Sequence, residues 1–202
     1  MTIRLLLADD QELIRTALAA LLQLEDDFEV VASVGRGDQV VAAARDHAPD
    51  IALLDIEMPG LDGLAAAAEL AAELPGCRVV MLTTFGRPGY LRRAMEAGAR
   101  GFVVKDAPAE ELAAAIRRAA AGERVVDPQL ATLTLAGGPS PLTAREHDVL
   151  VAARGGATVA EIAAKLILSE GTVRNYLSAA IVKTGARNRT EATRIADDRG
   201  WL

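Results

Sequence analysis

The sequence predicts two domains of different class: an α/β domain built on a doubly wound, five-stranded parallel sheet, and a smaller all-α domain of four helices behind it. Short apolar runs alternate with segments of helical periodicity five times in the first 122 residues. This alternation is typical of a parallel sheet covered by helices. From residue 142 onward no strand pattern occurs, and capping residues precede successive helical segments.

The boundary between the domains is predicted from composition. A chain of 202 residues is long for one average domain and sufficient for two small ones. We expect the first domain at residues 1–122, a linker at residues 123–141 and the second domain at residues 142–202. Residues 137–141 read Gly-Gly-Pro-Ser-Pro, and such a density of Gly and Pro is typical of a flexible boundary.

Charge is divided unevenly between the two parts. Residues 1–139 hold 13 basic and 21 acidic residues, whereas residues 140–202 hold 9 and 7. The acidic part suits a metal site, and the mildly basic part is compatible with nucleic acid. There is no N-terminal signal and no apolar run long enough to span a bilayer, so we expect a soluble, cytoplasmic protein without a membrane partner.

Periodicity and turn residues predict the elements of the first domain. Short runs rich in Leu, Val and Ile predict strands at residues 3–8, 28–34, 51–55, 79–82 and 102–104. Helical spacing of apolar residues predicts helices at residues 12–24, 38–47, 61–74, 87–97 and 107–121. Gly or Pro follows most of these helices closely, as expected for helix ends.

Polar residues stand at the ends of four of the strands. Asp9 and Asp10 follow the first strand, Asp55 closes the third, Thr83 ends the fourth and Lys105 ends the fifth. Ligands of α/β sheets bind beyond the carboxyl ends of the strands. Because close carboxylates repel unless a cation lies among them, and oxygen ligands suit Mg²⁺, a magnesium site is predicted here. An ionised Asp55 could then attack phosphorus and form an aspartyl phosphate, with Lys105 and Thr83 stabilising the transferred charge.

This arrangement resembles the receiver domain of bacterial two-component response regulators. The resemblance covers about the first three-fifths of the chain. It is carried by Asp9-Asp10, by Asp55 with Met58-Pro59-Gly60, by Thr83, and by the run from Gly98 to Lys105. It implies a flavodoxin-like sheet with strand order 2-1-3-4-5, and transfer of a phosphoryl group to Asp55 from a sensor histidine kinase.

The same resemblance implies further roles for individual residues. Mg²⁺ would be held by Asp9, Asp10, Asp55 and the backbone carbonyl of Glu57. Phe102 would be an aromatic switch that turns inward when Thr83 moves toward the phosphoryl group. Because Phe102 alternates with Val104 along its strand, an ordinary core position is an equal alternative.

The second domain is predicted to be a helix-turn-helix. Capping boxes open helices at residues 143–154 and 158–165, Ser169 caps a third helix that ends near Thr184, and the last helix begins at Asn188. Two short helices, a tight turn at residues 166–168 and a capped second helix form this motif. Its second helix enters the DNA major groove, and its first residues reach base edges.

Individual DNA contacts follow from this placement. The outward positions expected at base edges are Thr172, Arg174, Asn175 and Ser178, since Arg suits guanine and Asn suits adenine. The basic residues expected at phosphates are Lys165, Lys183, Arg187 and Arg189. Residues 142–202 resemble the LuxR/NarL-type (FixJ) DNA-binding domain, and the run Val173–Ser178 is closest to its DesR-like branch. Asn175 stands where many relatives carry His, which leaves the base preference open.

Both resemblances together imply a phosphorylation-controlled transcriptional regulator that is not an enzyme, forms a homodimer on phosphorylation and binds double-stranded promoter DNA. Pairing through the first and fifth helices, or through the fourth and fifth, is open. An Mg²⁺-dependent phosphatase would share the Asp55 chemistry, but the haloacid-dehalogenase-like signature has a second Asp where this chain has Glu57. The other alternative is a regulator that dimerises and binds DNA without phosphorylation.

Overall fold

The structure, a computed structural model, describes residues 2–83, 88–126, 131 and 140–202. It divides into two compact units, and the change from one to the other falls near residue 131. Arg87, the first residue of the predicted fourth helix, and residues 127–130 and 132–139 of the predicted linker lie outside the described residues. Within the described part of the chain, no helix is both long and apolar enough to cross a membrane.

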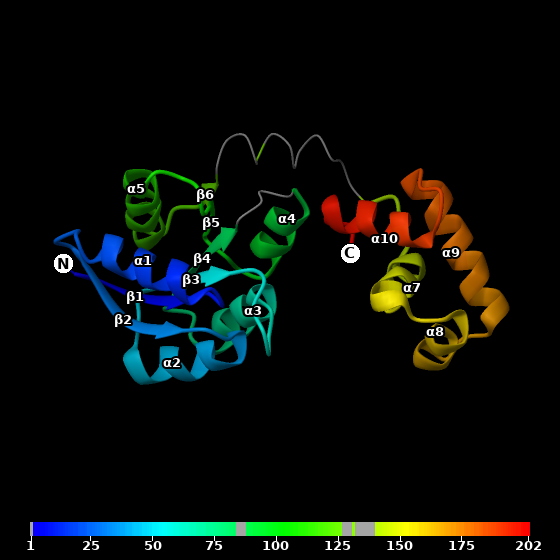
Figure 1. The fold of residues 1–202 in the computed structure, drawn as a ribbon, viewed down its shortest axis with the longest axis horizontal. Helices are drawn as coiled ribbons and strands as arrows, with labels where there is room; N and C mark the ends of the chain where they lie inside the picture. The colour runs from blue at the N-terminus through cyan, green and yellow to red at the C-terminus, as the bar shows by residue number, and fades with distance from the viewer. Residues whose placement is uncertain (1, 84–87, 127–130, 132–139) are drawn as a thin grey trace. The chain divides into compact units, whose positions relative to one another are not determined.

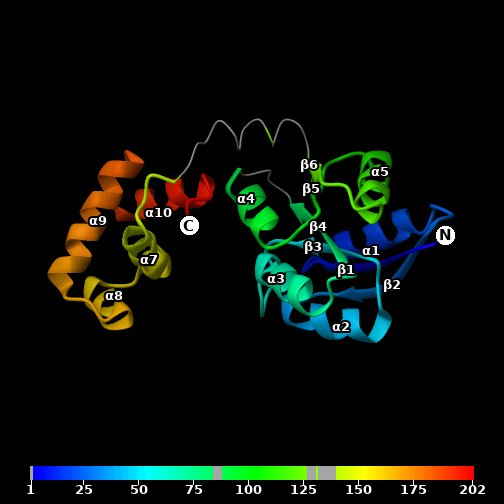
Figure 2. The same cartoon turned by 180° about the vertical axis from the view of Figure 1, so that it is seen from behind.

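The first unit is a parallel sheet with helices on both faces (Figure 1, and from behind in Figure 2). Its strands are β1 (Ile3–Ala8), β2 (Phe28–Val34), β3 (Ile51–Asp55), β4 (Arg78–Thr83), β5 (Gly101–Val104) and β6 (Val125–Val126). Their spatial order is β2-β1-β3-β4-β5-β6, and every neighbouring pair is parallel. The predicted fold class is confirmed.

The predicted number of five strands was wrong, because β6 adds a sixth. Gly101 pairs with Val125 and Phe102 pairs with Val126, which extends the sheet beyond β5. A strand of two residues has no measurable alternation, and it follows the Gly that ends the last helix of this unit. The sequence pattern therefore does not predict a strand here, and the predicted linker of residues 123–141 includes these two residues.

Helices alternate with the strands along the chain. They are α1 (Glu12–Leu22), the short 3-10 turn η1 (Gly37–Gln39) leading into α2 (Val40–His47), α3 (Gly63–Glu73), α4 (Pro88–Glu96) and α5 (Ala109–Ala120). Figure 1 shows α1 and α5 together on one side of the sheet and α2 and α3 on the other. The core beneath α1 and α5 is aliphatic; its members that are at most 2% exposed include Leu5, Leu53, Val80, Leu82 and Ile116.

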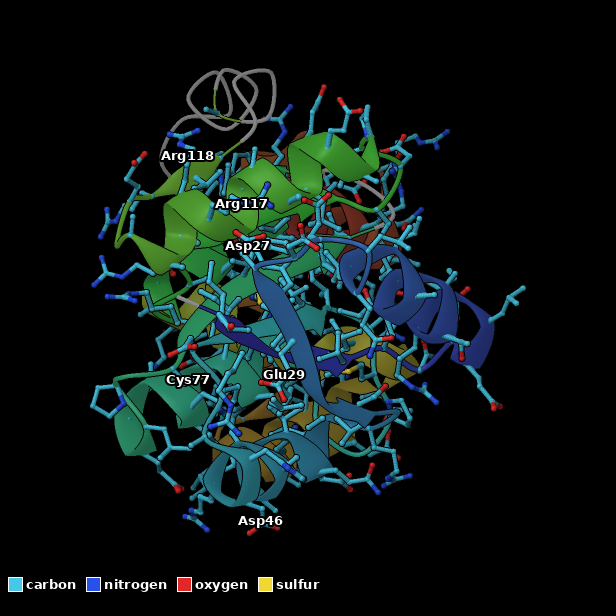
Figure 3. The ribbon with its side chains drawn as sticks, turned by 90° about the vertical axis from the view of Figure 1, so that its left-hand side faces the viewer. Asp27, Glu29, Asp46, Cys77, Arg117 and Arg118 are labelled. Carbon is cyan, nitrogen blue, oxygen red and sulfur yellow. The ribbon has the colours of Figure 1, made fainter. Side chains whose placement is uncertain are left out.

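Arg117 fixes α5 against the start of β2, as Figure 3 shows from the side. Its guanidinium donates to Asp27 at 2.6 Å and to Glu25 at 2.7 Å, and it lies 4.8 Å above the ring of Phe28. Hydrogen bonds to Asp27 and Glu25 raise the pKa of Arg117, so it stays charged. Because these groups are roughly two-fifths exposed, the ion pairs stabilise the fold only slightly, and their main effect is to orient the helix.

The chain is packed against itself where β3 ends. A Cβ atom placed on Gly63 would lie 1.8 Å from the carbonyl oxygen of Asp55, and one placed on Gly37 would lie 1.8 Å from the carbonyl oxygen of Leu61. The N–H of Gly63 also donates to the carbonyl of Ile56 at 2.9 Å. The first residue of α3 therefore lies directly against the last residue of β3, and only glycine leaves room for this contact.

We expect Gly63→Ala to lower the free energy of unfolding by about 1–3 kcal/mol, the usual cost of overpacking a tight site. Urea denaturation followed by circular dichroism measures this change. Gly76→Ala is the matched control, because a Cβ there meets nothing within 4 Å, and its effect should stay within about 0.5 kcal/mol. Equal stability of the two variants would contradict the close contact between α3 and β3.

The second unit is a helical bundle, as predicted. It contains α7 (Ala144–Ala153), the 3-10 turn η2 (Arg154–Gly156), α8 (Val159–Leu166), α9 (Glu170–Thr184) and α10 (Arg189–Asp198). Both predicted capping boxes are present, at Thr143 with Glu146 and at Thr158 with Glu161. The core is again aliphatic, and it includes Val149, Leu150, Ile162, Val173 and Ala192.

Candidate functional site

Three carboxyl groups meet where β1 and β3 end. Oxygen atoms of Asp9, Asp10 and Asp55 all lie within 4.8 Å of one another. Asp9 and Asp55 are 2% and 5% exposed, whereas Asp10 is exposed. The parallel register that pairs Ala8 with Leu54 brings the next residues of both strands, Asp9 and Asp55, to the same edge.

Local hydrogen bonds hold one oxygen of each buried carboxylate. The N–H of Gln11 donates to Oδ1 of Asp9 at 2.9 Å, and the N–H of Ile56 donates to Oδ1 of Asp55 at 2.8 Å. Arg15 of α1 adds a bond of 2.6 Å to the backbone carbonyl of Asp9. The loops thus fix the Oδ1 atoms. The Oδ2 atoms remain to interact with the other side chains at this edge of the sheet, which we call the rim.

Lys105 contacts both remaining oxygens. Its Nζ lies 2.7 Å from Oδ2 of Asp9 and 2.9 Å from Oδ2 of Asp55, and its side chain is only 7% exposed. Burial lowers the pKa of Lys105, but the bonds to Asp9 and Asp55 outweigh it and the net pKa is raised. Burial, with the nearby charge of Asp9, raises the pKa of Asp55 even though Lys105 opposes the shift. One ammonium therefore does not compensate the three carboxylates fully.

This donor set fits a magnesium ion. Carboxylate oxygens are the ligands that Mg²⁺ prefers, and a divalent cation would supply the positive charge that Lys105 alone does not. Within the described ranges, Asp9, Asp10 and Asp55 have oxygens close enough together to hold such an ion. Glu57, predicted to contribute its backbone carbonyl, is an exposed residue on the turn two positions after Asp55.

Thr83 and Phe102 lie on the strands next to this rim. Thr83 is 4% exposed at the end of β4, and its carbonyl accepts a hydrogen bond of 2.7 Å from the N–H of Lys105. Phe102 is fully buried on β5, beside Met81 and Val126 on the neighbouring strands. The structure therefore brings Thr83 and Lys105 to the edge that carries the acids, and it places Phe102 in the core below that edge.

The second unit exposes the face of α9 that was predicted to read bases. Arg174, Asn175 and Ser178 are exposed, Thr172 is half-buried, and Val173 between them is fully buried. Ser169 caps the helix by accepting from the N–H of Thr172 at 3.1 Å. Arg174 is held by Glu170 one turn earlier at 2.6 Å, which orients its guanidinium along the exposed face.

Three of the four predicted phosphate contacts already have partners within the bundle. Lys183 donates to Glu146 at 2.7 Å, Arg187 binds Glu191 at 3.0 Å, and Arg189 donates to the carbonyl of Ala157 at 2.9 Å. The fourth, Lys165, is exposed at the end of α8 and has no ion-pair partner among the described residues.

Sequence reasoning missed the groups that support these sites. Glu146 is only 5% exposed, and its contact with Lys183 joins residues 37 positions apart, so no local pattern reveals it. Glu191 and Arg187 are four residues apart, so their ion pair would have been visible in the sequence as an i, i+4 pair. Hydrogen bonds from Arg187 lower the pKa of Glu191 to about 2. Nothing in the sequence distinguishes Arg15, which holds the Asp9 loop, from a solvated arginine.

Two family models match the chain. The response regulator receiver domain matches residues 5–117, and the bacterial regulatory proteins, luxR family, match residues 140–196. The chain belongs to the LuxR family of bacterial response regulators. It is a phosphorylation-regulated, DNA-binding regulator of transcription that works in a two-component system.

Relatives extend this match over the whole length. The transcriptional regulatory protein DesR of Bacillus subtilis (strain 168) is 44% identical over 200 residues, with 99% of each chain covered. The uncharacterized transcriptional regulatory protein YvfU of the same organism is 45% identical over 202 residues, covering 99% of this chain and 100% of its own. The crystal structure of the response regulator ChrA is 33% identical, with a TM-score of 0.60 over 100% of this chain and 99% of that one.

We expect the main effect of Lys183→Met to be a lower stability of the folded protein, and not a lower affinity for DNA. Removing the ammonium leaves the buried carboxylate of Glu146 without its cation, at a cost of about 1–3 kcal/mol. The net pKa of Glu146 is lowered: burial raises it, but the bonds to Lys183 and Thr143 outweigh this. The stabilisation is therefore present at neutral pH, above the carboxylate's ordinary pKa, and is lost as pH falls through the lowered value.

Thermal unfolding of the wild type and of Lys183→Met at neutral and acidic pH measures this difference. The two curves should separate at pH 7 and approach each other in acid. Arg145→Met is the matched control, because its contact with Asp148 is 3.8 Å long and exposed. A Lys183 variant with unchanged stability at pH 7 and a lower salt dependence of DNA affinity would assign Lys183 to a phosphate instead.

Proposed function

We propose that Asp55 is the phosphoacceptor of this regulator. The observation that carries the proposal is the position of its Oδ2 atom, 2.9 Å from Lys105 at the open end of the sheet, beside two further acids. In the step we propose, a carboxylate oxygen of Asp55 forms a bond to the phosphorus of a phosphohistidine on a sensor kinase. The phosphorus–nitrogen bond breaks, and the imidazole of the kinase leaves with its electron pair.

The neighbouring residues stabilise the charge of this step. Asp9, Asp10, Asp55 and the carbonyl of Glu57 would hold Mg²⁺, which when bound would supply the positive charge that phosphoryl oxygens need. Lys105 loses its contact with Oδ2 of Asp55 when that atom is phosphorylated, and its ammonium is then available to a phosphoryl oxygen while it keeps Asp9. The hydroxyl of Thr83 binds a second phosphoryl oxygen.

Movement of Thr83 would carry the signal away from the rim. Thr83 is tied through its carbonyl to the N–H of Lys105, so both residues respond to one event. Phe102 is buried close to them, and we propose that it is the aromatic switch of the receiver. A core ring is buried in both states, whereas a ring that turns inward on phosphorylation is more exposed before it, so the exposure of Phe102 in the unphosphorylated protein separates the two roles.

The α1–α5 face is the surface that we propose for pairing of two receivers. Leu13 and Leu24, on and just after α1, are 84% and 78% exposed, and Leu21 is 47% exposed. Several large aliphatic side chains exposed along one helix favour an interaction surface there. Pairing links two DNA-binding units, so two weak half-sites are bound with a higher effective concentration.

For the DNA-binding unit, we propose that α9 lies in the major groove of promoter DNA. Arg174 would contact a guanine, Asn175 an adenine, and Thr172 and Ser178 neighbouring base edges or sugars. Lys165 would contact a phosphate. The main role of Lys183, Arg187 and Arg189 would be to stabilise the bundle. They would contribute to DNA binding only through their positive charge.

The remaining parts of the proposal follow from this mechanism. The receiver domain takes in residues 1–122 and, in addition, β6, so the segment between the domains begins after Val126 and the DNA-binding domain takes residues 142–202. A regulator that binds chromosomal DNA acts in the cytoplasm. It is not a turnover enzyme, because Glu57 stands where the related phosphatase signature has its second Asp.

Asp55→Asn should abolish covalent phosphorylation by acetyl phosphate with Mg²⁺, since the amide is not a nucleophile at phosphorus. Intact-protein mass spectrometry detects the phosphoryl group, and sedimentation velocity detects the dimer. Asp46→Asn, an exposed acid on α2 away from the rim, is the matched control and should react as the wild type does. The proposal is wrong if Asp55→Asn dimerises and binds DNA like the acetyl-phosphate-treated wild type.

Arg174→Ala and Lys165→Ala should change DNA binding in different ways. Loss of the base contact should cost about 1–3 kcal/mol on the specific site and relax selectivity at one base pair. Loss of the phosphate contact should weaken binding to all sequences equally and lower the salt slope by about one. Fluorescence anisotropy at several salt concentrations measures both effects. Equal behaviour of the two variants would contradict the proposed orientation of α9.

A further inference from the structure

Ile167 adopts a backbone conformation that disfavours its own side chain. It follows α8 with φ 55° and ψ 51°, in the left-handed region. Of the described residues, Ala48 is the other one besides glycine with a positive φ. A β-branched side chain is especially unfavourable in this region, because its Cβ substituents crowd the backbone. Glycine would occupy the same position without strain.

The side chain of Ile167 gains nothing within its own unit to offset this cost. It is 92% exposed, the highest value among the exposed large aliphatic side chains that the structure describes. The turn itself is fixed by its neighbours, since Leu166 and Leu168 on either side pack against the core of the bundle. The geometry of the turn therefore imposes the left-handed conformation. The side chain of Ile167 itself does not stabilise the folded bundle.

The position of Ile167 indicates what the side chain contacts. Ser169, two residues later, caps α9 and shares a hydrogen bond of 2.8 Å with the hydroxyl of Thr172. Exposed Lys165 stands two residues earlier. The N-terminal end of the second helix of such a motif reaches base edges, so the preceding turn lies at the rim of the groove, next to the sugar–phosphate backbone. Strained residues that persist in a fold are often tied to function in this way.

We propose that Ile167 is a DNA-contacting residue whose side chain packs on a backbone deoxyribose at the groove rim, beside the phosphate bound by Lys165. The proposal rests on the docking of α9 in the major groove proposed above. It assigns to Ile167 a non-ionic and sequence-independent part of the affinity. The isoleucine thus lowers the stability of the free protein and contributes to the complex.

Three substitutions of Ile167 in the full-length, acetyl-phosphate-treated protein test this assignment. Ile167→Gly removes both the strain and the apolar surface. Ile167→Asn keeps a side chain of similar length that tolerates the left-handed region but is polar. Ile167→Leu keeps the apolar surface without the branch at Cβ. Affinity is measured by fluorescence anisotropy with a labelled duplex from a footprinted promoter and with a random-sequence duplex of equal length.

The Gly and Asn variants should lose about threefold to tenfold in affinity, as expected for exposing part of one aliphatic side chain. The loss should be equal on both duplexes, and the slope of log affinity against log salt should not change, because no ion pair is removed. Ile167→Leu should bind within twofold of the wild type, on the same grounds of retained apolar area. Ile167→Gly should also raise the melting temperature of the free protein.

Ala48→Gly is the matched control, because it relieves the same backbone conformation at an exposed position of the first unit. It should leave DNA affinity unchanged. Wild-type affinity of both Ile167→Gly and Ile167→Asn, while Arg174→Ala still binds weakly, would overturn the contact and leave the proposed function standing. If Arg174→Ala also binds DNA like the wild type, the proposed docking of α9 in the major groove is wrong, and with it the basis of the Ile167 contact.

Two other outcomes also overturn the assignment. A loss in Ile167→Gly with wild-type affinity in Ile167→Asn would mean that a rigid turn, and not an apolar contact, is required. A loss confined to the promoter duplex would mean that the side chain reads a base, such as the methyl group of thymine, and not the backbone.

Discussion

The contact of Lys105 with Asp9 and Asp55 is the interaction on which the receiver half of this molecule depends. Three carboxylates, two from the residues just after β1 and one from the last residue of β3, lie within 4.8 Å of one another, and they would repel without a cation. A single ammonium at 2.7 Å and 2.9 Å holds the two buried acids together, while burial still raises the pKa of Asp55. The rim is therefore folded but short of positive charge, which suits a site that receives a divalent cation and then a phosphoryl group.

The parallel sheet explains why such a site exists at all. The strands end at the same edge, so residues at or directly after these ends, from Asp9 to Lys105, meet without a long loop between them. The close approach of Gly63 to the carbonyl of Asp55 and the bond from Lys105 to Thr83 keep these strand ends rigid. In the mechanism that we propose, this rim converts the change of charge on Asp55 into displacement of its neighbours.

The DNA-binding half divides its charged residues between two tasks. Glu146 and Glu191 bind Lys183 and Arg187, which join the ends of helices within the bundle. Arg174 and Lys165 stay on the exposed face around the start of α9. The strained turn at Ile167 adjoins this same face. The backbone conformation of Ile167 therefore lowers the stability of the free protein at the place where we propose that DNA binds. The net charge of +2 for residues 140–202 conceals this separation.

The order of strands and helices and the grouping of polar residues at the strand ends could be predicted from the sequence, because both follow from local periodicity and from parallel topology. The sixth strand could not, since two residues carry no alternation. The partners of Lys183 and Arg189 could not, because they come from segments 37 and 32 residues away. The backbone of Ile167 could not, because the turn forces a conformation that the residue type itself opposes.

The most direct test of the central claim is a crystal structure of the protein grown with Mn²⁺ in place of Mg²⁺, with the metal located from its anomalous scattering. We expect one strong peak in contact with oxygen atoms of Asp9, Asp10 and Asp55, and none in an otherwise identical crystal of Asp10→Asn at the same Mn²⁺ concentration. A wild-type crystal with Mn²⁺ bound elsewhere and no peak among these three residues would contradict the account.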